Sequence, residues 1–305
     1  MFTHILVPLD GSVLAEAVLP YVRLLAGKPG GRVTLLHLIE RAAPQTVHGA
    51  HHLRTVADAE EYLAGVARDL AESGVTVETH IDTNEGGDTP NRIESHATEW
   101  RVDLVALCVH GRSGLGRLFF GSIAQSVLGA GVAPVLLVIA PGKGVTAASA
   151  PTLDHLFVPL DGTPEAEVAL PLVVEIARER GSTIHLTLVV PTRDTVSGSM
   201  GGAARFSPTA TAVFLTQTAQ DAEGYLNEKV AQLRIAGVAV QAEVQRGDPA
   251  TGVLAAAKRI PADLTAVASH GRSGLEGAWM GSVGNTVLAR AAGPFLLVRR
   301  WDGPR

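Results

Sequence analysis

Apolar and polar residues in the first half of the chain follow two alternating patterns. Nearly continuous apolar runs, typical of buried strands, occupy residues 4–10, 32–40, 102–110 and 134–140, and residues 75–81 alternate like a half-buried strand. Longer amphipathic segments lie between the runs and predict helices at residues 14–27, 58–74, 91–100 and 122–131. Gly74 predicts the end of the second helix, and Pro20 is expected either to lie within the first helix or to kink it.

This alternation of strands and helices predicts the fold class. Parallel strands need long crossover connections, so strands separated by helices favour one parallel sheet with right-handed crossovers. Continuous apolar strands indicate that helices cover both faces of the sheet. We therefore expect a doubly wound, Rossmann-like α/β domain with a five-stranded parallel sheet, whose ligands bind beyond the carboxyl ends of the strands.

The second half of the chain repeats the first. Residues 4–12, HILVPLDGS, match residues 155–163, HLFVPLDGT. Later, residues 109–122, VHGRSGLGRLFFGS, match residues 269–282, SHGRSGLEGAWMGS. The period is longer than a solenoid repeat, so it indicates duplication of a whole domain.

The repeat sets the expected domain boundaries. We expect a first domain at residues 1–140, a linker at 141–152 and a second domain at 153–305. The last strand of each copy is an apolar edge that needs covering, so we expect these two strands to pair within the chain. Residues 197–211, rich in small residues, predict a mobile loop near the second pocket.

Composition narrows the functional classes. The 305 residues carry a net charge of -5, which does not indicate a nucleic-acid-binding surface. Cys108 is the single cysteine, which excludes an internal disulfide and a cysteine-rich metal site. The start lacks the features of a signal peptide, and the apolar runs are too short to cross a bilayer. We expect a cytoplasmic protein without a membrane or nucleic-acid partner.

The repeated glycine-rich loop has the features of an anion site. It lies between a predicted strand and a predicted helix, whose first N–H groups attract negative charge. Gly111 permits the turn off the strand, Gly121 admits a phosphate close to the backbone, and the Ser122 hydroxyl can cap the helix or bond to phosphate. Asp10 follows the first strand at the same sheet edge, where a carboxylate can accept hydrogen bonds from a ribose.

Structural readings stay open beside these functional ones. Gly111, Gly121 and Ser122 can form a turn and a helix cap alone, and Asp10 and Asp161 can simply cap the helices that follow them. The lysine of a Walker A loop is missing, and G-x-G-x-x-G does not fit. The last glycine of G-x-S-x-G is also missing in both copies, which disfavours a serine hydrolase.

The histidines near these loops favour structural roles. His110 and His270 precede the loop glycines, and a structural hydrogen bond is a better reading for them than a general base, since no nucleophile or metal partner is evident. His48, His51 and His52 form a cluster with no counterpart in the second copy, which favours a solvated loop over a metal site.

Taken in order, these motifs resemble the universal stress protein family in a tandem two-domain form. Both copies carry a strand ending VPLDG, a later H-G followed after nine residues by G-S, and a final apolar strand, so the resemblance covers nearly the whole chain. It implies a five-stranded parallel sheet with helices on both faces, and ATP bound through G-x2-G-x9-G-[ST].

The resemblance also implies nucleotide-binding positions in each copy. In the first copy, with its loop arginine, they are Pro8, Asp10, Leu38, Cys108, Gly111, Arg112, Gly121, Ser122 and Ile123. In the second copy they are Pro159, Asp161, Val189, Gly247, Ala268, Gly271, Arg272, Gly281, Ser282 and Val283. The resemblance places Leu38 and Val189 beside the adenine, and Gly247 in a turn that shapes the adenine pocket.

Two departures from the family motif bear on this assignment. Cys108 and Ala268 stand where the motif has its first glycine, and each adds a Cβ where the nucleotide is expected to pass. Cys108 itself reads as a small buried residue. The first loop carries Arg117, whereas the second has Glu276 nearby, so charge favours triphosphate binding at the first loop. The smaller side chain of Ala268 favours binding at the second.

The leading functional hypothesis is a stress-response regulatory protein that binds ATP, with or without Mg²⁺, in one or both halves. Slow or absent hydrolysis is expected, because the sequence shows no metal-binding carboxylate pair and no residue placed to activate water. Two alternatives stay open: a scaffold of the same fold without nucleotide binding, and a slow ATPase. A homodimer also stays open.

Overall fold

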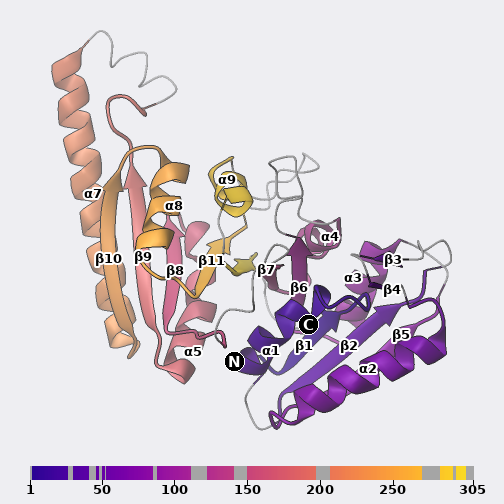
Figure 1. The fold of residues 1–305 in the computed structure, drawn as a ribbon. Helices are drawn as coiled ribbons and strands as arrows, with labels where there is room; N and C mark the ends of the chain where they lie inside the picture. Colours follow the sequence, from indigo (N-terminus) through magenta and orange to yellow (C-terminus); the bar gives the residue numbers. More distant parts are fainter. Residues whose placement is uncertain are drawn as a thin grey trace. The chain divides into compact units, whose positions relative to one another are not determined.

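The computed structural model divides the chain into two compact units (Figure 1). The first contains the described residues up to Thr152 and strand β12 (Phe295–Val298), and the second contains those between Leu153 and His270 and helix α9 (Ser282–Arg290). The structure describes residues 2–26, 30–40, 46–47, 50–51, 53–84, 88–110, 122–140, 150–196, 207–269, 282–290 and 293–299.

The first unit is built on a parallel sheet, as the sequence predicts. Its strands are β1 (His4–Pro8), β2 (Arg32–Leu38), β5 (Thr76–Asp82), β6 (Leu104–His110) and β7 (Val135–Ala140). They lie parallel in the order β5-β2-β1-β6-β7. Two short strands, β3 (Thr46–Val47) and β4 (Ala50–His51), form a separate antiparallel pair.

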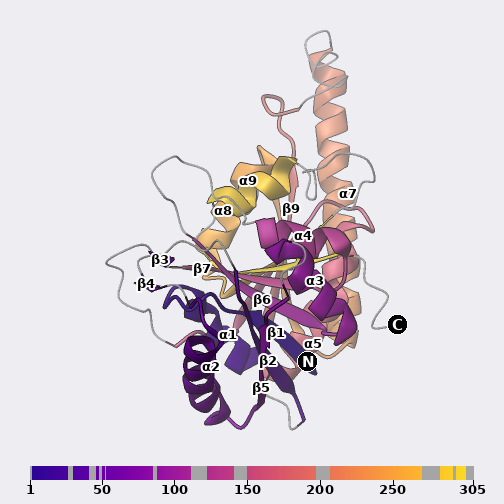
Figure 2. The same ribbon diagram turned by 90° about the vertical axis from the view of Figure 1, so that its right-hand side faces the viewer.

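Helices cover both faces of this sheet (Figure 2). The helices are α1 (Leu19–Leu25) and α2 (Val56–Ala71) on one face, and α3 (Thr89–Glu99) and α4 (Ser122–Ala130) on the other. Side-chain caps explain where two of them begin. Thr55 accepts a hydrogen bond from the N–H of Asp58 before α2, and Asp88 accepts one from the N–H of Asn91 before α3.

The predicted helix at residues 14–27 is divided, and of the two expectations for Pro20 the structure confirms that it lies within a helix. A 3-10 helix spans Ala15–Val18, and α1 begins only at Leu19. Pro20 therefore lies in the first turn of α1, where the N–H that proline lacks has no partner within the helix. The proline helps to start this helix and does not bend it.

The second unit repeats the same arrangement. Its parallel strands lie in the order β10-β9-β8-β11, with bounds β8 (His155–Leu160), β9 (Thr183–Val190), β10 (Ala239–Arg246) and β11 (Leu264–Ala268). Besides α9, its helices are a 3-10 helix (Ala166–Ala169), α5 (Leu170–Arg180), α7 (Pro208–Ile235) and α8 (Pro249–Arg259). Together, the two units confirm the predicted doubly wound α/β class.

Helix α7 begins earlier than the sequence predicts. It lies along β10 and extends past the end of that strand (Figure 1). Residues 208–211, predicted as part of a mobile loop, form its first turn, because Pro208 is accommodated at a helix start. The rest of that predicted loop, 197–206, lies outside the described residues.

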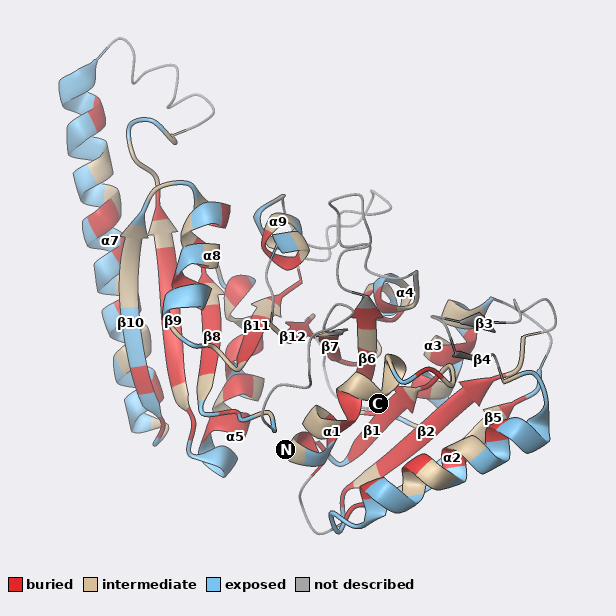
Figure 3. Cartoon of the chain, in the orientation of Figure 1, coloured by how far each residue is buried: buried red, intermediate tan, exposed pale blue. Residues whose placement is uncertain are grey.

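Strand β12 completes the sheet of the first unit. It runs antiparallel to β7, with Phe295 opposite Leu137 and Leu297 opposite Val135. Both strands are apolar and buried, like the other central strands of the sheet (Figure 3). The expectation that the last strands of the two copies pair within the chain is confirmed.

Candidate functional site

A pocket lies at the carboxyl edge of the sheet in the first unit. It encloses about 120 Å³ where the ends of β1, β2 and β6 meet the first turns of α3 and α4. The described residues that line it are Pro8, Leu9, Asp10, Ala15, His37, Leu38, Glu40, Thr89, Ile93, Leu107, Cys108 and Ile123. Parallel sheets of this class bind their ligands at this edge.

Five residues that the family resemblance singles out meet in this pocket. Pro8, Asp10, Leu38, Cys108 and Ile123 all line it, although they come from four stretches that are far apart in the sequence. Cys108 is half-buried and forms part of the wall, so it is more exposed than the small buried residue that was expected. The reason is its position near the end of β6, where the strand reaches the open edge.

Asp10 orders its own loop. Its Oδ1 accepts hydrogen bonds from the N–H of Ser12 at 2.9 Å and from the Ser12 hydroxyl at 2.6 Å. Ser12 Oγ in turn accepts from the N–H of Ala15 at 3.1 Å, so Ser12, not Asp10, contacts the helical turn that follows. Asp161 makes the same two bonds to Thr163 in the second copy. Direct capping by the aspartates is therefore wrong in both copies.

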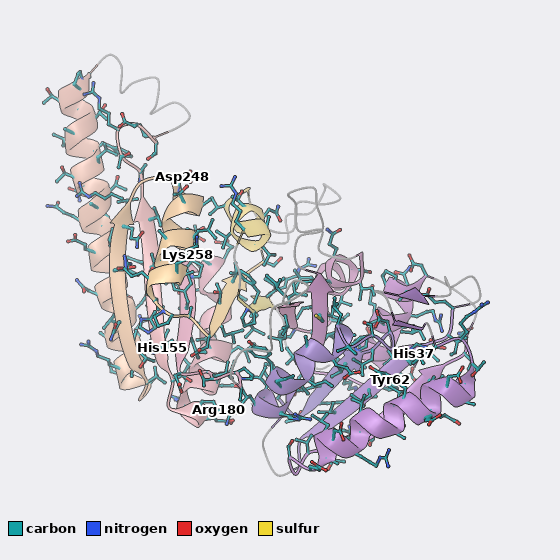
Figure 4. The ribbon with its side chains drawn as sticks, viewed as in Figure 1. His37, Tyr62, His155, Arg180, Asp248 and Lys258 are labelled. Carbon is teal, nitrogen blue, oxygen red and sulfur yellow. The ribbon has the colours of Figure 1, made fainter. Side chains whose placement is uncertain are left out.

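His37 joins three segments beside the pocket (Figure 4). Its ring is buried, with Nδ1 2.8 Å from the carbonyl oxygen of Leu9 and Nε2 3.2 Å from that of Leu53. Gly11, at φ +86, packs so closely on Leu53 that a Cβ there would lie 2.7 Å from Leu53 Cγ. Sequence reasoning missed His37, because a single histidine in an apolar strand carries no sign of these contacts.

Glu40 and Thr89 form a polar part of the pocket wall. Thr89, the first residue of α3, donates from Oγ1 to Oε1 of Glu40 at 2.5 Å. The rest of the wall is largely apolar and includes Ile93 and Leu107. Sequence reasoning did not assign Glu40, Thr89, Ile93 or Leu107 to the site. A signal was present at Glu40, which is a carboxylate just after a strand at the edge where ligands are expected.

Arg92 ties α3 to the ends of β2 and β5. It donates to the Asp82 carboxylate and carbonyl, both at 2.9 Å, and to the Ile39 carbonyl at 3.2 Å. His96 Nε2 lies 3.0 Å from the same carboxylate. Burial would raise the pKa of Asp82, but hydrogen bonds from Arg92, the N–H of Asn84 and His96 outweigh it and lower the pKa to about 2. The carboxylate is thus held ionised, and the end of β2 is fixed.

The second copy builds the corresponding edge differently. Gly252 stands where the first copy has Arg92, and a Cβ there would lie 2.8 Å from Cγ2 of Val189. Helix α8 therefore packs directly over Val189, with no buried arginine between them. Val283 is 37% exposed in the first turn of α9. Ser282 is the first residue of α9, and the remaining described site residues of this copy lie at or just after strand ends: Pro159, Asp161, Gly247 and Ala268.

Most of the glycine-loop predictions lie outside the described residues, namely Gly111, Arg112, Gly121, Gly271, Arg272 and Gly281. Ser122 and Ser282 are the first residues of α4 and α9, so these helices begin where the sequence predicts. Within the described part of the chain, no three histidine, cysteine or acidic side chains are placed to hold a metal ion. Two members of the predicted histidine cluster, His48 and His52, also lie outside it.

Comparison with known proteins gives consistent results. The model of the universal stress protein family matches residues 1–138 and again 152–299. A universal stress protein of Mycolicibacterium smegmatis is 28% identical over 312 residues, which cover 97% of this chain and 96% of the relative. Universal stress protein Rv2005c of Mycobacterium tuberculosis is 30% identical over 203 residues, or 65% of this chain and 62% of the relative.

The fold is also that of solved structures. A universal stress protein from Archaeoglobus fulgidus has a TM-score of 0.70 to this chain at 19% sequence identity, and the likeness covers 98% of each chain. At 19% identity the structural likeness shows a shared fold, whereas the double match to the family model shows membership of the family. The chain therefore belongs to the universal stress protein family, as a member with two tandem Rossmann-like domains.

Proposed function

We propose that this chain is a stress-response regulatory protein that binds ATP in the pocket of its first unit. The observation that carries the proposal is the meeting of Pro8, Asp10, Leu38, Cys108 and Ile123 around one pocket at the carboxyl edge. These are positions that the family resemblance implies for nucleotide contact, and they come from β1 and the loop after it, β2, β6 and α4 of the first copy.

The chemistry of the described lining fits the nucleoside part of ATP. A base can pack on the apolar side chains of Leu38, Ile93 and Leu107, and ribose hydroxyls can donate to the Asp10 carboxylate. The first N–H groups of α4 begin beside Ile123, so the phosphates, with or without Mg²⁺, are proposed to lie toward that helix start.

We propose slow or absent hydrolysis. General-base catalysis needs a side chain that can take a proton from an attacking water. Among the described lining residues, His37 has both ring nitrogens facing backbone carbonyl oxygens. The carboxylates of Asp10 and Glu40 are proposed to meet the ribose and the base, away from the phosphates. Bound ATP would then act by stabilising one conformation or one partner surface.

The proposal extends to the setting of the protein. We propose a cytoplasmic protein with domains at residues 1–140 and 153–305, no nucleic-acid partner and a homodimeric state. The net charge of -5 supports the exclusion of nucleic acid. None of the described helices combines the length and the apolar character that a membrane span requires.

Calorimetric titration with ATP tests the proposed site through a matched pair of variants. Ile123→Trp fills the first pocket, and Val283→Trp makes the same change at the corresponding position of α9. We expect Ile123→Trp to weaken binding about tenfold or more, because overpacking costs about 1–3 kcal/mol, and Val283→Trp to leave it unchanged. Loss in Val283→Trp alone would move the site to the second unit, and no binding by the parent protein would refute ATP binding.

Cys108 favours a second candidate function, a scaffold without nucleotide binding. Its side chain lines the pocket where the family motif has a glycine. The scaffold predicts no change in the melting temperature of the parent protein with ATP, ADP or AMP. Because the Cys108 side chain is what would exclude the nucleotide, Cys108→Gly should restore a shift. A slow ATPase instead predicts turnover that Asp10→Ala abolishes, so one thermal series and one turnover assay separate the three candidates.

A further inference from the structure

Glu40 stands out among the pocket residues because its carboxylate is already held in place. It follows β2 by two residues, is half-buried, and lines the pocket. Its Oε1 accepts a hydrogen bond of 2.5 Å from the hydroxyl of Thr89 at the start of α3. A carboxylate offers about four lone-pair positions, and the Thr89 hydroxyl uses one of them.

The backbone that carries Glu40 is also fixed. The neighbouring Ile39 donates its N–H to the carbonyl of Asp82 at 2.9 Å, and its own carbonyl accepts from Arg92 at 3.2 Å. Arg92 and Asp82 are themselves buried and paired. A group held in this way loses little conformational freedom when a ligand binds, so its hydrogen bond contributes more to affinity.

The order of the strands indicates which part of a nucleotide would meet Glu40. β2, β1 and β6 are neighbours in the sheet, in that order. Glu40 and Asp10 come two residues after the ends of β2 and β1, and Ile123 lies in α4, the helix that follows β6. Strands lie about 4.8 Å apart, so the ends of β2 and β6 are about 10 Å from each other. With phosphates at α4 and the ribose near Asp10, the base falls at the end of β2.

The second copy lacks this acceptor. Strand register pairs Leu38 with Asp82 in the first copy and Val189 with Gln245 in the second, so Pro191 stands where the first copy has Glu40. The arginine that fixes the backbone beside Glu40 is missing as well, since Gly252 replaces Arg92. The carboxylate and its support occur together in the first unit and are absent together from the described residues of the second.

We infer that Glu40 accepts a hydrogen bond from the exocyclic amino group of the bound base, and that it makes the first unit selective for an amino-bearing purine. The inference rests on the proposed ATP binding. In adenine nucleotides the base has N–H donors only on its 6-amino group. Leaving a half-buried carboxylate without that donor in a largely apolar pocket is unfavourable.

The experiment compares ATP with purine riboside triphosphate, which lacks only the 6-amino group. Guanine offers N–H donors of its own, so the amino-free purine isolates this contact better than GTP does. Dissociation constants for both ligands are measured by calorimetry in the parent protein, in Glu40→Ala and in the similarly sized Glu40→Gln. Glu78→Ala removes an exposed carboxylate of β5 outside the pocket lining and serves as the matched control.

We expect the parent protein to bind ATP about tenfold or more tightly than the amino-free analogue, as a hydrogen bond to a charged group allows. Glu40→Ala should bring the ratio close to one, Glu40→Gln should reduce it, and Glu78→Ala should preserve it. Tight ATP binding with an unchanged ratio in Glu40→Ala and Glu40→Gln overturns the role of Glu40 and leaves ATP binding intact. No binding of either ligand by the parent protein overturns both.

Discussion

The guanidinium of Arg92 lies 2.9 Å from the carboxylate of Asp82, and both side chains are more than nine-tenths buried. The pair joins α3 to β5 and, through the Ile39 carbonyl, to the end of β2. Gln245 and Gly252 stand at the corresponding places in the second copy. The two units thus share a fold, but they use different means to fix the edge where a ligand would bind.

Removal of one partner of this pair should destabilise the first unit. Asp82→Ala leaves a buried guanidinium without its carboxylate, so we expect a loss of about 3–5 kcal/mol in unfolding free energy. Glu78→Ala breaks the exposed pair with Arg32 and should cost less than about 1 kcal/mol. Urea unfolding followed by Trp100 fluorescence, with Trp279 and Trp301 replaced by phenylalanine, compares the two. Similar losses in both variants would contradict the prediction.

The same carboxylate should make stability depend on acidic pH. The pKa of Asp82 is lowered to about 2 in the folded protein, so the stabilisation is complete above its unfolded value and disappears as pH falls through the folded value. We therefore expect the parent protein to lose stability between about pH 4 and pH 2. In Asp82→Asn this part of the loss should be missing. Unfolding of both proteins across that range by urea is the measurement, and parallel curves would count against the prediction.

A second pH effect should arise in the second unit at the pair of half-buried His155 and buried His185. Nδ1 of His155 lies 3.0 Å from Nε2 of His185. Burial, followed by the neighbouring His155, lowers the pKa of His185, while Glu243 acts in the opposite direction. Since the folded pKa lies below the unfolded value, stability should decrease as pH falls below about 6.5.

Replacement by the residue of the first copy tests this pH effect. His185→Thr introduces the side chain that Thr34 supplies at the matching position of β2. We expect the variant to lose less melting temperature than the parent protein between about pH 7 and pH 5. Calorimetry at both pH values gives the comparison, and an equal loss in the two proteins would show that this histidine pair does not cause it.

Gly252 should be required by close packing. An added Cβ would lie 2.8 Å from Val189 Cγ2, so Gly252→Ala should cost about 1–3 kcal/mol. Gly224 lies inside α7 with nothing within 4 Å of such a Cβ, and Gly224→Ala should stabilise by up to about 1 kcal/mol. Denaturant unfolding should therefore show a lower free energy of unfolding for Gly252→Ala and a higher one for Gly224→Ala. The double variant Gly252→Ala with Val189→Ala should show a smaller loss than the two single changes added together.

The sequence was sufficient to predict the strands and the edge where the site lies. A parallel strand covered on both faces needs apolar side chains on both sides, and this leaves a strong pattern at β1, β2, β6 and β7. Residues of the site could be predicted where a family motif marks them. Glu40 and His37 carry no such motif, and their roles depend on which strand ends and carbonyl groups meet in space.

Local sequence was misleading where tertiary context decides. Pro208 was expected to belong to a loop, yet it lies in the first turn of α7, and Pro20, for which a kink was one of two expectations, lies in the first turn of α1. The pair of Asp82 and Arg92 could not be predicted, because the two residues lie on different elements and meet only when α3 packs at the end of β5.

Strand β12 supports a last prediction, because the second copy encodes it and it belongs to the sheet of the first unit. A chain cut at a protease site inserted in the linker, residues 141–152, should stay together in gel filtration. Leu296→Asp places a charge at a fully buried position of β12 and should let the fragments separate. Val213→Asp introduces an aspartate on α7 at a side chain that is 66% exposed, and its fragments should stay together. If the fragments of the parent protein separate, or both variants behave alike, the pairing of β7 with β12 does not hold them together.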